Sequence, residues 1–117
     1  MAAAHFNCLA KERGLPYTAI SRGVDPDSSI PAKIRGGLSA DGLAPVDDVP
    51  KPIIAAEASD AIRVVAFDAL PEDRRGRAEV GLWSDVPPAT KDYAAARDAI
   101  LRHIDDLILG LAERPRP

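Results

Sequence analysis

The chain contains one cysteine, and a lone thiol is the first candidate for nucleophilic chemistry. Cys8 lies within a helical pattern beside Leu9, whereas a reactive thiolate is normally stabilised by a helix N-terminus or by nearby cations. We therefore interpret Cys8 as a small buried apolar residue. The two histidines, His5 and His103, fall on different predicted helices without metal-ligand spacing, which favours solvent-edge or capping roles. The sequence predicts no metal site and no cofactor.

Two aspartates follow predicted strands, and their position is more informative than that of the thiol. Asp68 ends one strand, and Asp85 lies in the loop after another, where Pro87 and Pro88 stiffen the chain. Ligands of open α/β sheets bind beyond the carboxyl ends of the strands, and a rigid loop can hold a carboxylate for proton transfer. From spacing alone, a turn aspartate is the simpler interpretation of Asp85. The glycines complete no phosphate-binding fingerprint and no serine-nucleophile elbow.

The elements that must position these residues are helices and strands, which alternate along the chain. The hydrophobic pattern predicts helices at 1–13, from Ser28 or Ser29 to about 41, at 55–61 and at 92–113, strands at 17–22, 62–67 and 79–83, a helix or turn at 71–77, and a proline-rich loop at 43–54. The final helix is the clearest, because one apolar stripe runs along its length. This order predicts an α/β sandwich with a short, mainly parallel sheet.

Composition sets limits on the class of protein. The 117 residues fit a single domain, and 46% hydrophobic residues argue against wholesale disorder. A formal charge of −3 provides no electrostatic footprint for nucleic acid. No apolar stretch approaches the ~20 residues of a membrane span, and the N-terminus lacks the pattern of a secretory signal. These features predict a cytoplasmic protein without nucleic-acid or membrane partners.

Four segments carry a resemblance to a known family. They are the helix from Met1 to Gly14, the segment Tyr17 to Gly23 with Ser21-Arg22-Gly23 at its end, the strand Ile62 to Asp68, and Trp83-Ser84-Asp85-Val86-Pro87-Pro88 followed by Asp92-Tyr93 and the last helix. In order and spacing they resemble the low-molecular-weight protein tyrosine phosphatases and the related arsenate reductases. The resemblance implies a three-layer α/β sandwich with flavodoxin-like strand order and hydrolysis of phosphate monoesters through a cysteinyl-phosphate. It also implies that Asp85 is the general acid, with Asp92 as the substitute if the loop is aligned differently.

The most diagnostic motif of that family is not in the sequence. Its nucleophilic cysteine, followed by five residues and an arginine, forms the loop that binds the oxyanion, whereas Cys8 and Arg13 are separated by four residues of predicted helix. We therefore expect residues 1–117 to be a single incomplete phosphatase-like domain, shortened before the first helix and inactive as written. A phosphate or arsenate oxyanion is the expected ligand of the full-length form only. Without the first strand, the strands at 17–22 and 62–67 would face a gap with unpaired backbone groups, which could lead to self-association through an exposed strand edge.

Two alternatives remain open at this point. One is an arsenate reductase-like enzyme that uses an external small thiol, since one cysteine does not support a cascade of several. The other is a non-catalytic remnant that binds a partner by strand addition or, more weakly, an unstable fragment without function.

Overall fold

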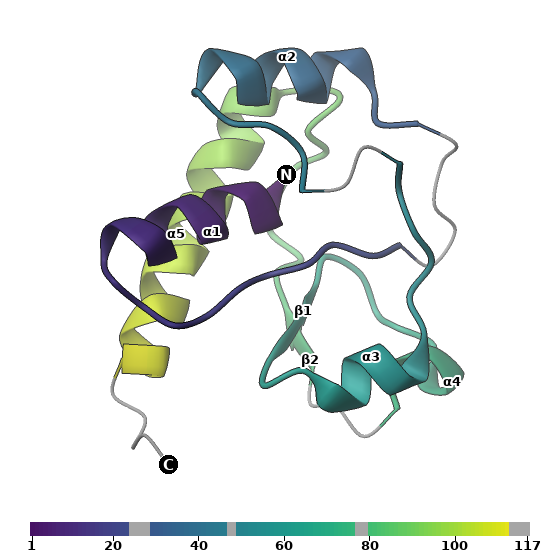
Figure 1. The fold of residues 1–117 in the computed structure, drawn as a ribbon. Helices are drawn as coiled ribbons and strands as arrows, with labels where there is room; N and C mark the ends of the chain where they lie inside the picture. The colour runs from purple at the N-terminus through teal and green to yellow at the C-terminus, as the bar shows by residue number, and fades with distance from the viewer. Residues whose placement is uncertain (24–28, 47–48, 77–79, 113–117) are drawn as a thin grey trace.

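The computed structural model describes residues 1–23, 29–46, 49–76 and 80–112 (Figure 1). The elements are α1 (Ala2–Glu12), α2 (Ala32–Ala40), α3 (Ala55–Asp60), β1 (Val64–Ala66), α4 (Glu72–Arg75), β2 (Val80–Leu82) and α5 (Tyr93–Ala112). Helices α1, α2 and α5 gather on one side of the molecule, while α3 and α4 lie beside each other near the strands. The predicted α/β class is confirmed.

The hydrophobic core lies where α1 packs against α5. Its buried side chains are Phe6, Ala10, Ile100, Ile104, Ile108 and Leu111. On α5 these residues recur every three or four positions, which places them on one face of the helix and confirms the apolar stripe read from the sequence. Trp83 and Val86, from the loop after β2, pack against the same core. The loop that contains Asp85 is therefore held by apolar contacts on both sides of the aspartate.

The sheet described by the structure is short and parallel. Val64 pairs with Val80, Val65 with Gly81, and Ala66 with Leu82. The strands predicted at 62–67 and 79–83 thus shrink to three residues each, with position 79 outside the described residues. Because the strands are parallel, their carboxyl ends lie at the same edge of the sheet. That edge leads into Phe67 and Asp68 on one side and into Trp83 and Asp85 on the other.

The strand predicted at 17–22 is wrong, although burial alternates from Leu15 to Ile20 as it would in a strand. Leu15, Tyr17 and Ala19 are half-buried, and the residues between them are exposed. A strand also needs a hydrogen-bonding neighbour, and within the described residues this segment forms no ladder. Instead, the Asn7 side chain donates from Nδ2 to the Ala19 carbonyl at 3.0 Å and accepts from the Ala19 N–H at 2.7 Å. A side-chain amide thus replaces the neighbouring strand.

At its end, the segment 17–23 contacts the part of the molecule that contains α3. Gly23 and Pro52 form an isolated parallel bridge, and Arg22 makes a two-pronged contact with the Glu57 carboxylate, with both N–O distances at 3.0 Å. These contacts tie the segment to the loop before α3 and to α3 itself.

The bounds of the helices differ from the predictions, by single residues for α1 and α3. The second helix begins after Pro31, whose carbonyl accepts from Ile34 and Arg35, so Ser29 does not cap it and Ser28 lies outside the described residues. Proline disfavours helical geometry in the residue before it, which explains the later start. The helix or turn predicted at 71–77 is α4, with position 77 outside the described residues. The helix predicted at 92–113 is α5, which begins at Tyr93, and position 113 lies outside the described residues. In the part of the chain that the structure describes, no helix combines the length and apolarity needed to cross a bilayer.

Candidate functional site

The loop after β2 carries the predicted acid and continues the sheet at its carboxyl edge. The Trp83 N–H donates to the Ala66 carbonyl at 2.8 Å, so the chain leaves the sheet only after the tryptophan. A turn follows, in which the Val86 N–H donates to the Trp83 carbonyl at 3.4 Å. Asp85 lies in this turn with 63% of its side chain exposed. The structure therefore presents Asp85 to solvent on a loop whose flanking residues are packed in the core.

A histidine from α5 meets this aspartate. His103 Nε2 lies 2.6 Å from Asp85 Oδ1, and the imidazole stacks on the Trp83 indole with ring centroids 4.7 Å apart and planes inclined by 10°. Phe67 makes an edge-to-face contact with the Trp83 indole, with ring centroids 6.2 Å apart. We call Phe67, Trp83, Asp85 and His103 the acid-loop cluster. It joins both strand ends and the last helix.

The charge of Asp85 depends on this histidine. The hydrogen bond from His103 is the main reason that the pKa of Asp85 lies below its ordinary value, and the nearby positive charge of Arg102 acts in the same direction. Desolvation opposes the shift only in part. The carboxyl group of this exposed turn is thus held ionised.

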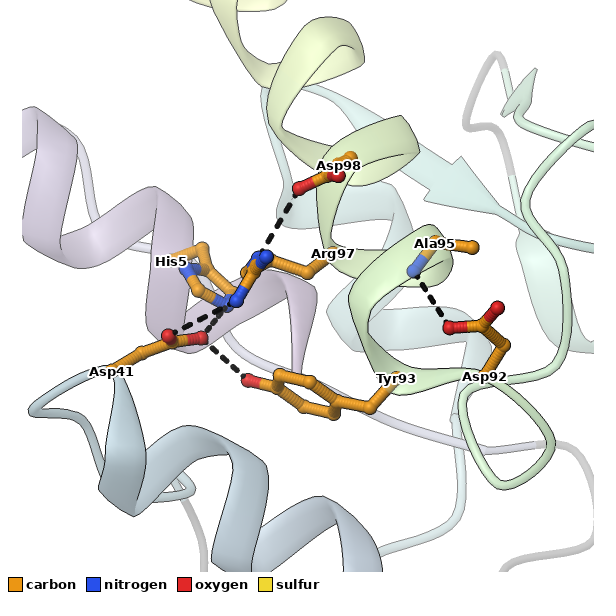
Figure 2. A network of polar contacts seen from close by, with 7 residues as sticks. All are labelled: His5, Asp41, Asp92, Tyr93, Ala95, Arg97 and Asp98. Atoms are coloured by element: carbon orange, nitrogen blue, oxygen red, sulfur yellow. Dashed lines mark hydrogen bonds and ion pairs between the residues drawn. The ribbon is translucent and has the colours of Figure 1, made fainter.

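Asp92, the substitute for Asp85 in the predicted acid role, serves α5 instead. Its Oδ1 accepts from the Ala95 N–H at 3.0 Å, as Figure 2 shows, and its carbonyl accepts from Ala96. This is the geometry of an N-cap, which satisfies a backbone donor at the open end of a helix. The structure does not bring Asp92 into the acid-loop cluster.

The thiol lies on a different element from both aspartates. Cys8 is half-buried on α1, less buried than the sequence analysis predicts, and its Sγ lies 3.9 Å from Glu12 Oε1. Arg13, the nearest arginine along the chain, binds Asp105 on α5 at 3.1 Å. Cys8 thus lies within a helix beside an acid, whereas a reactive thiolate is normally stabilised by a helix N-terminus or by cations. Asp68 is exposed and follows β1 without joining the acid-loop cluster.

A second polar group links α1, α2 and α5 (Figure 2). Asp41, which ends α2, accepts from the Tyr93 hydroxyl at 3.0 Å and from Arg97 at 3.3 Å. His5 of α1 is buried, with 6% exposure. Its Nε2 lies 3.9 Å from Asp41 Oδ2 and has no hydrogen-bond partner among the residues that the structure describes. The solvent-edge role predicted for His5 is therefore wrong. We call His5, Asp41, Tyr93 and Arg97 the interhelix network.

Burial determines the protonation of this network. Desolvation lowers the pKa of His5, and although Asp41 acts in the opposite direction, the charges of the N-terminal amino group and Arg97 add to the lowering. Desolvation, together with the hydrogen bond to the Asp41 carboxylate, raises the pKa of Tyr93 to about 12. Both groups are held neutral, which suits a structural contact between helices.

Sequence reasoning missed the partners in both groups. The four-residue spacing of Tyr93 and Arg97 was a usable signal, because it places both on one face of a helix. Nothing in the sequence pairs either of them with Asp41, which is more than fifty positions away. For His103, whose side chain is 28% exposed and so fits the predicted solvent-edge position, the sequence did not indicate the contacts with Asp85 and Trp83.

The fold has close counterparts among solved structures, although the sequence matches no family model and no curated relative. A protein tyrosine phosphatase from Entamoeba histolytica, crystallised with Hepes in its active site, superposes with a TM-score of 0.77 over 96% of this chain and 87% of its own. This chain has the fold of that phosphatase. A product-state mimic of the Entamoeba enzyme gives 0.76 over 99% and 88%, and an apo form gives 0.74 over 99% and 92%. Sequence identity is 17% in each case, so the similarity is one of architecture.

Proposed function

We propose that the chain is a low-molecular-weight protein tyrosine phosphatase-like protein that does not hydrolyse phosphate monoesters by itself. The observation that carries the proposal is the superposition on the Entamoeba phosphatase over 96% of the chain. It supports the phosphatase resemblance with evidence independent of the sequence motifs. The order of segments and the architecture thus point to the same class of protein.

The expected lack of turnover follows from the nucleophile. The 117 residues contain no cysteine followed by five residues and an arginine. Cys8 cannot replace it, because its neighbour is the Glu12 carboxylate and the Arg13 guanidinium binds Asp105 instead. Oxyanion binding needs convergent N–H groups and a guanidinium that matches two oxygens. Residues 8–12 belong to α1 and Arg13 is its C-cap, and the Arg13 N–H is used in a bond to the Leu9 carbonyl.

Under this proposal, the chain carries the residue for the acid side of the reaction. Asp85 lies beyond the carboxyl ends of the parallel strands, where open α/β sheets bind their ligands. It is exposed, and the core contacts of Trp83 and Val86 fix the loop around it. We therefore assign proton donation to Asp85, at the carboxyl edge of the sheet.

The first experiment measures hydrolysis of an aryl phosphate by the purified chain. We expect no turnover above that of buffer, with the Cys8→Ser variant indistinguishable from the original and the Entamoeba phosphatase as the positive control. Turnover that disappears on the Cys8→Ser substitution would contradict the assignment of Cys8 as non-catalytic.

The second experiment adds a nucleophile loop to the chain. A chimera that carries the first strand and the Cys-x5-Arg loop of a low-molecular-weight phosphatase ahead of Met1 should hydrolyse an aryl phosphate. Asp85→Asn in that chimera should lower turnover by about 100-fold or more, the usual contribution of a general acid. A chimera that folds, as judged by circular dichroism, but shows no turnover would refute the phosphatase-like assignment. Arsenate reduction by the chimera with an external thiol, without phosphatase activity, would favour the arsenate reductase alternative.

A further inference from the structure

The carboxyl group of Asp85 is exposed, yet a side chain from another element holds it. His103 Nε2 lies 2.6 Å from Asp85 Oδ1, which is shorter than a usual N–H···O hydrogen bond. A carboxylate can only accept, so the histidine nitrogen is the donor. Because this donor belongs to α5 and not to the loop, the bond fixes the carboxyl group relative to the helical core.

The imidazole of His103 is itself held in place. It stacks on the Trp83 indole, with ring centroids 4.7 Å apart and planes inclined by 10°. The backbone N–H of Trp83 in turn donates to the Ala66 carbonyl at 2.8 Å, so the indole continues from the sheet. Along α5 the histidine directly precedes Ile104, which is 1% exposed. The sheet and the buried face of α5 therefore both fix the direction in which Nε2 points.

We propose that His103 is the positioning residue of the acid loop: its bond to Oδ1 orients the Asp85 carboxyl group and leaves the transferable proton on Oδ2. The inference deepens the proposed function and rests on it for the reaction that the proton serves. In that reaction the Oδ2–H bond of Asp85 breaks, the proton passes to the leaving oxygen, and Asp85 becomes a carboxylate. His103 takes no part in the proton transfer.

Proton transfer requires this kind of orientation. A general acid has to lie within hydrogen-bond reach of the group that it protonates, and a supporting hydrogen bond locks the rotamer of a side chain that would otherwise move among several. The contact leaves 63% of the Asp85 side chain exposed, so the carboxyl group stays open to an incoming group. The bond from His103 also lowers the pKa of Asp85, which stabilises the carboxylate that remains when the proton has left.

The other charged groups near the pair come from α5 and from the end of α1. Arg102 favours the ionised form of Asp85, as does the N–H of the aspartate itself, but the hydrogen bond from the histidine is the largest influence. Arg13 pairs with Asp105 at 3.1 Å, so these two charges offset each other. From the strand side, the acid-loop cluster receives the uncharged ring of Phe67.

The test follows the Asp85 carboxyl carbon in the full chain by NMR as the pH is lowered. In the original chain the signal should titrate below the ordinary aspartate value of about 3.9. His103→Leu, which removes the donor, should raise the midpoint toward that value. His103→Gln, whose amide can donate from a similar position, should keep most of the lowering. Arg102→Gln is the matched control, because it removes a neighbouring charge without removing the bond, and it should raise the midpoint less than His103→Leu.

A second measurement at pH 7 needs no titration. The Hα–Hβ couplings of Asp85 should be those of a single rotamer in the original chain and in His103→Gln, and averaged in His103→Leu. An ordinary midpoint in the original chain, or averaged couplings there, would overturn the inference, and neither outcome requires that a variant folds. Equal midpoints in the original chain and in His103→Leu would also overturn it. Because no arm depends on hydrolysis, an inactive chimera would refute the proposed function without affecting this result.

Discussion

The helical side and the sheet side of this molecule are stabilised in different ways. Helices α1 and α5 enclose the buried core, with Ile104 among its most completely buried side chains at 1% exposure. Around the strands, by contrast, large apolar side chains remain in solvent, with Ile62 at 58% and Leu82 at 54% exposure. The core of the chain is therefore a contact between helices, and the two three-residue strands lie beside it.

The difference reflects how far along the sequence each kind of element finds its hydrogen-bond partners. A helix satisfies its backbone hydrogen bonds within itself and needs only one partner face for its apolar stripe. A strand makes its backbone hydrogen bonds with neighbouring strands, half of them on each side. Without a neighbour on one side, those polar backbone groups need other partners. In this chain Asn7 provides such a partner for Ala19. Many of the other residues on the sheet side are exposed to solvent.

The largest effect should come from removing volume between α1 and α5. Ile104→Ala should destabilise the fold by about 2–5 kcal/mol, because it removes a buried side chain and leaves a cavity. Leu109→Ala, on the exposed face of the same helix at 60% exposure, should change stability by less than about 0.5 kcal/mol. Urea denaturation followed by circular dichroism measures both. Equal losses in the two variants would mean that the core is elsewhere.

The next effect concerns two adjacent glycines of α2. A Cβ atom at Gly37 would lie 2.5 Å from the Tyr93 ring, whereas a Cβ at Gly36 meets nothing within 4 Å. Gly37→Ala should therefore cost about 1–3 kcal/mol through overpacking between α2 and α5. Gly36→Ala should stabilise the helix by up to about 1 kcal/mol. Thermal unfolding of the pair is a direct measurement, and a gain in both variants would show that Tyr93 does not touch α2.

A smaller loss should follow from removing the substitute for a neighbouring strand. Asn7→Ala deletes both hydrogen bonds to Ala19 and should cost about 1–2 kcal/mol, since the Ala19 backbone groups are left partly buried without partners. Hydrogen exchange should show the Ala19 amide among the most strongly affected. The control is Asn7→Asp, which keeps the acceptor and should preserve more of the protection at Ala19. Unchanged exchange at Ala19 in Asn7→Ala would rule out the role we assign to Asn7.

The smallest effect is a slope of stability against pH set by His5. Its pKa is lowered in the folded chain, so the unfolded chain binds the proton first as pH falls below the ordinary value of about 6.5. Stability is therefore complete above that value and declines toward the folded pKa. Urea midpoints at several pH values should show a flatter dependence for His5→Gln than for the original chain. Parallel curves would mean that burial of His5 carries no titration penalty.

How well the sequence predicted the structure follows the same division between helices and strands. The apolar stripe from Ile100 to Leu111 predicted α5 well, because every contact that defines a helix is a few residues away. The alternation at 17–22 matches the alternating burial as far as Ile20, but it could not predict that the described residues form no ladder there. Pairing depends on a neighbour distant in sequence, and the segment's own residues contain no information about it.

For the candidate site, it was easier to predict which residue could do chemistry than which residues contact one another. Asp85 could be proposed from a proline-stiffened loop after a strand, and its acid role stays a prediction that the chimera tests. Its contact with His103 joins positions eighteen residues apart, on a loop and on a helix, and depends on how α5 rotates about its axis. The packing of Ile100, Ile104 and Ile108 determines that rotation, so the partner of Asp85 is set by the core.

The contact between Asn7 and Ala19 also sets the length of the chain between them. The planar amide of Asn7 accepts and donates to one residue only, which fixes Ala19 at that position along α1. Inserting or deleting a single residue between Gly14 and Ala19 would bring the next side chain to the same point and turn Leu15 and Tyr17 outward. Substitutions should thus be tolerated in this connection far better than any change in its number of residues.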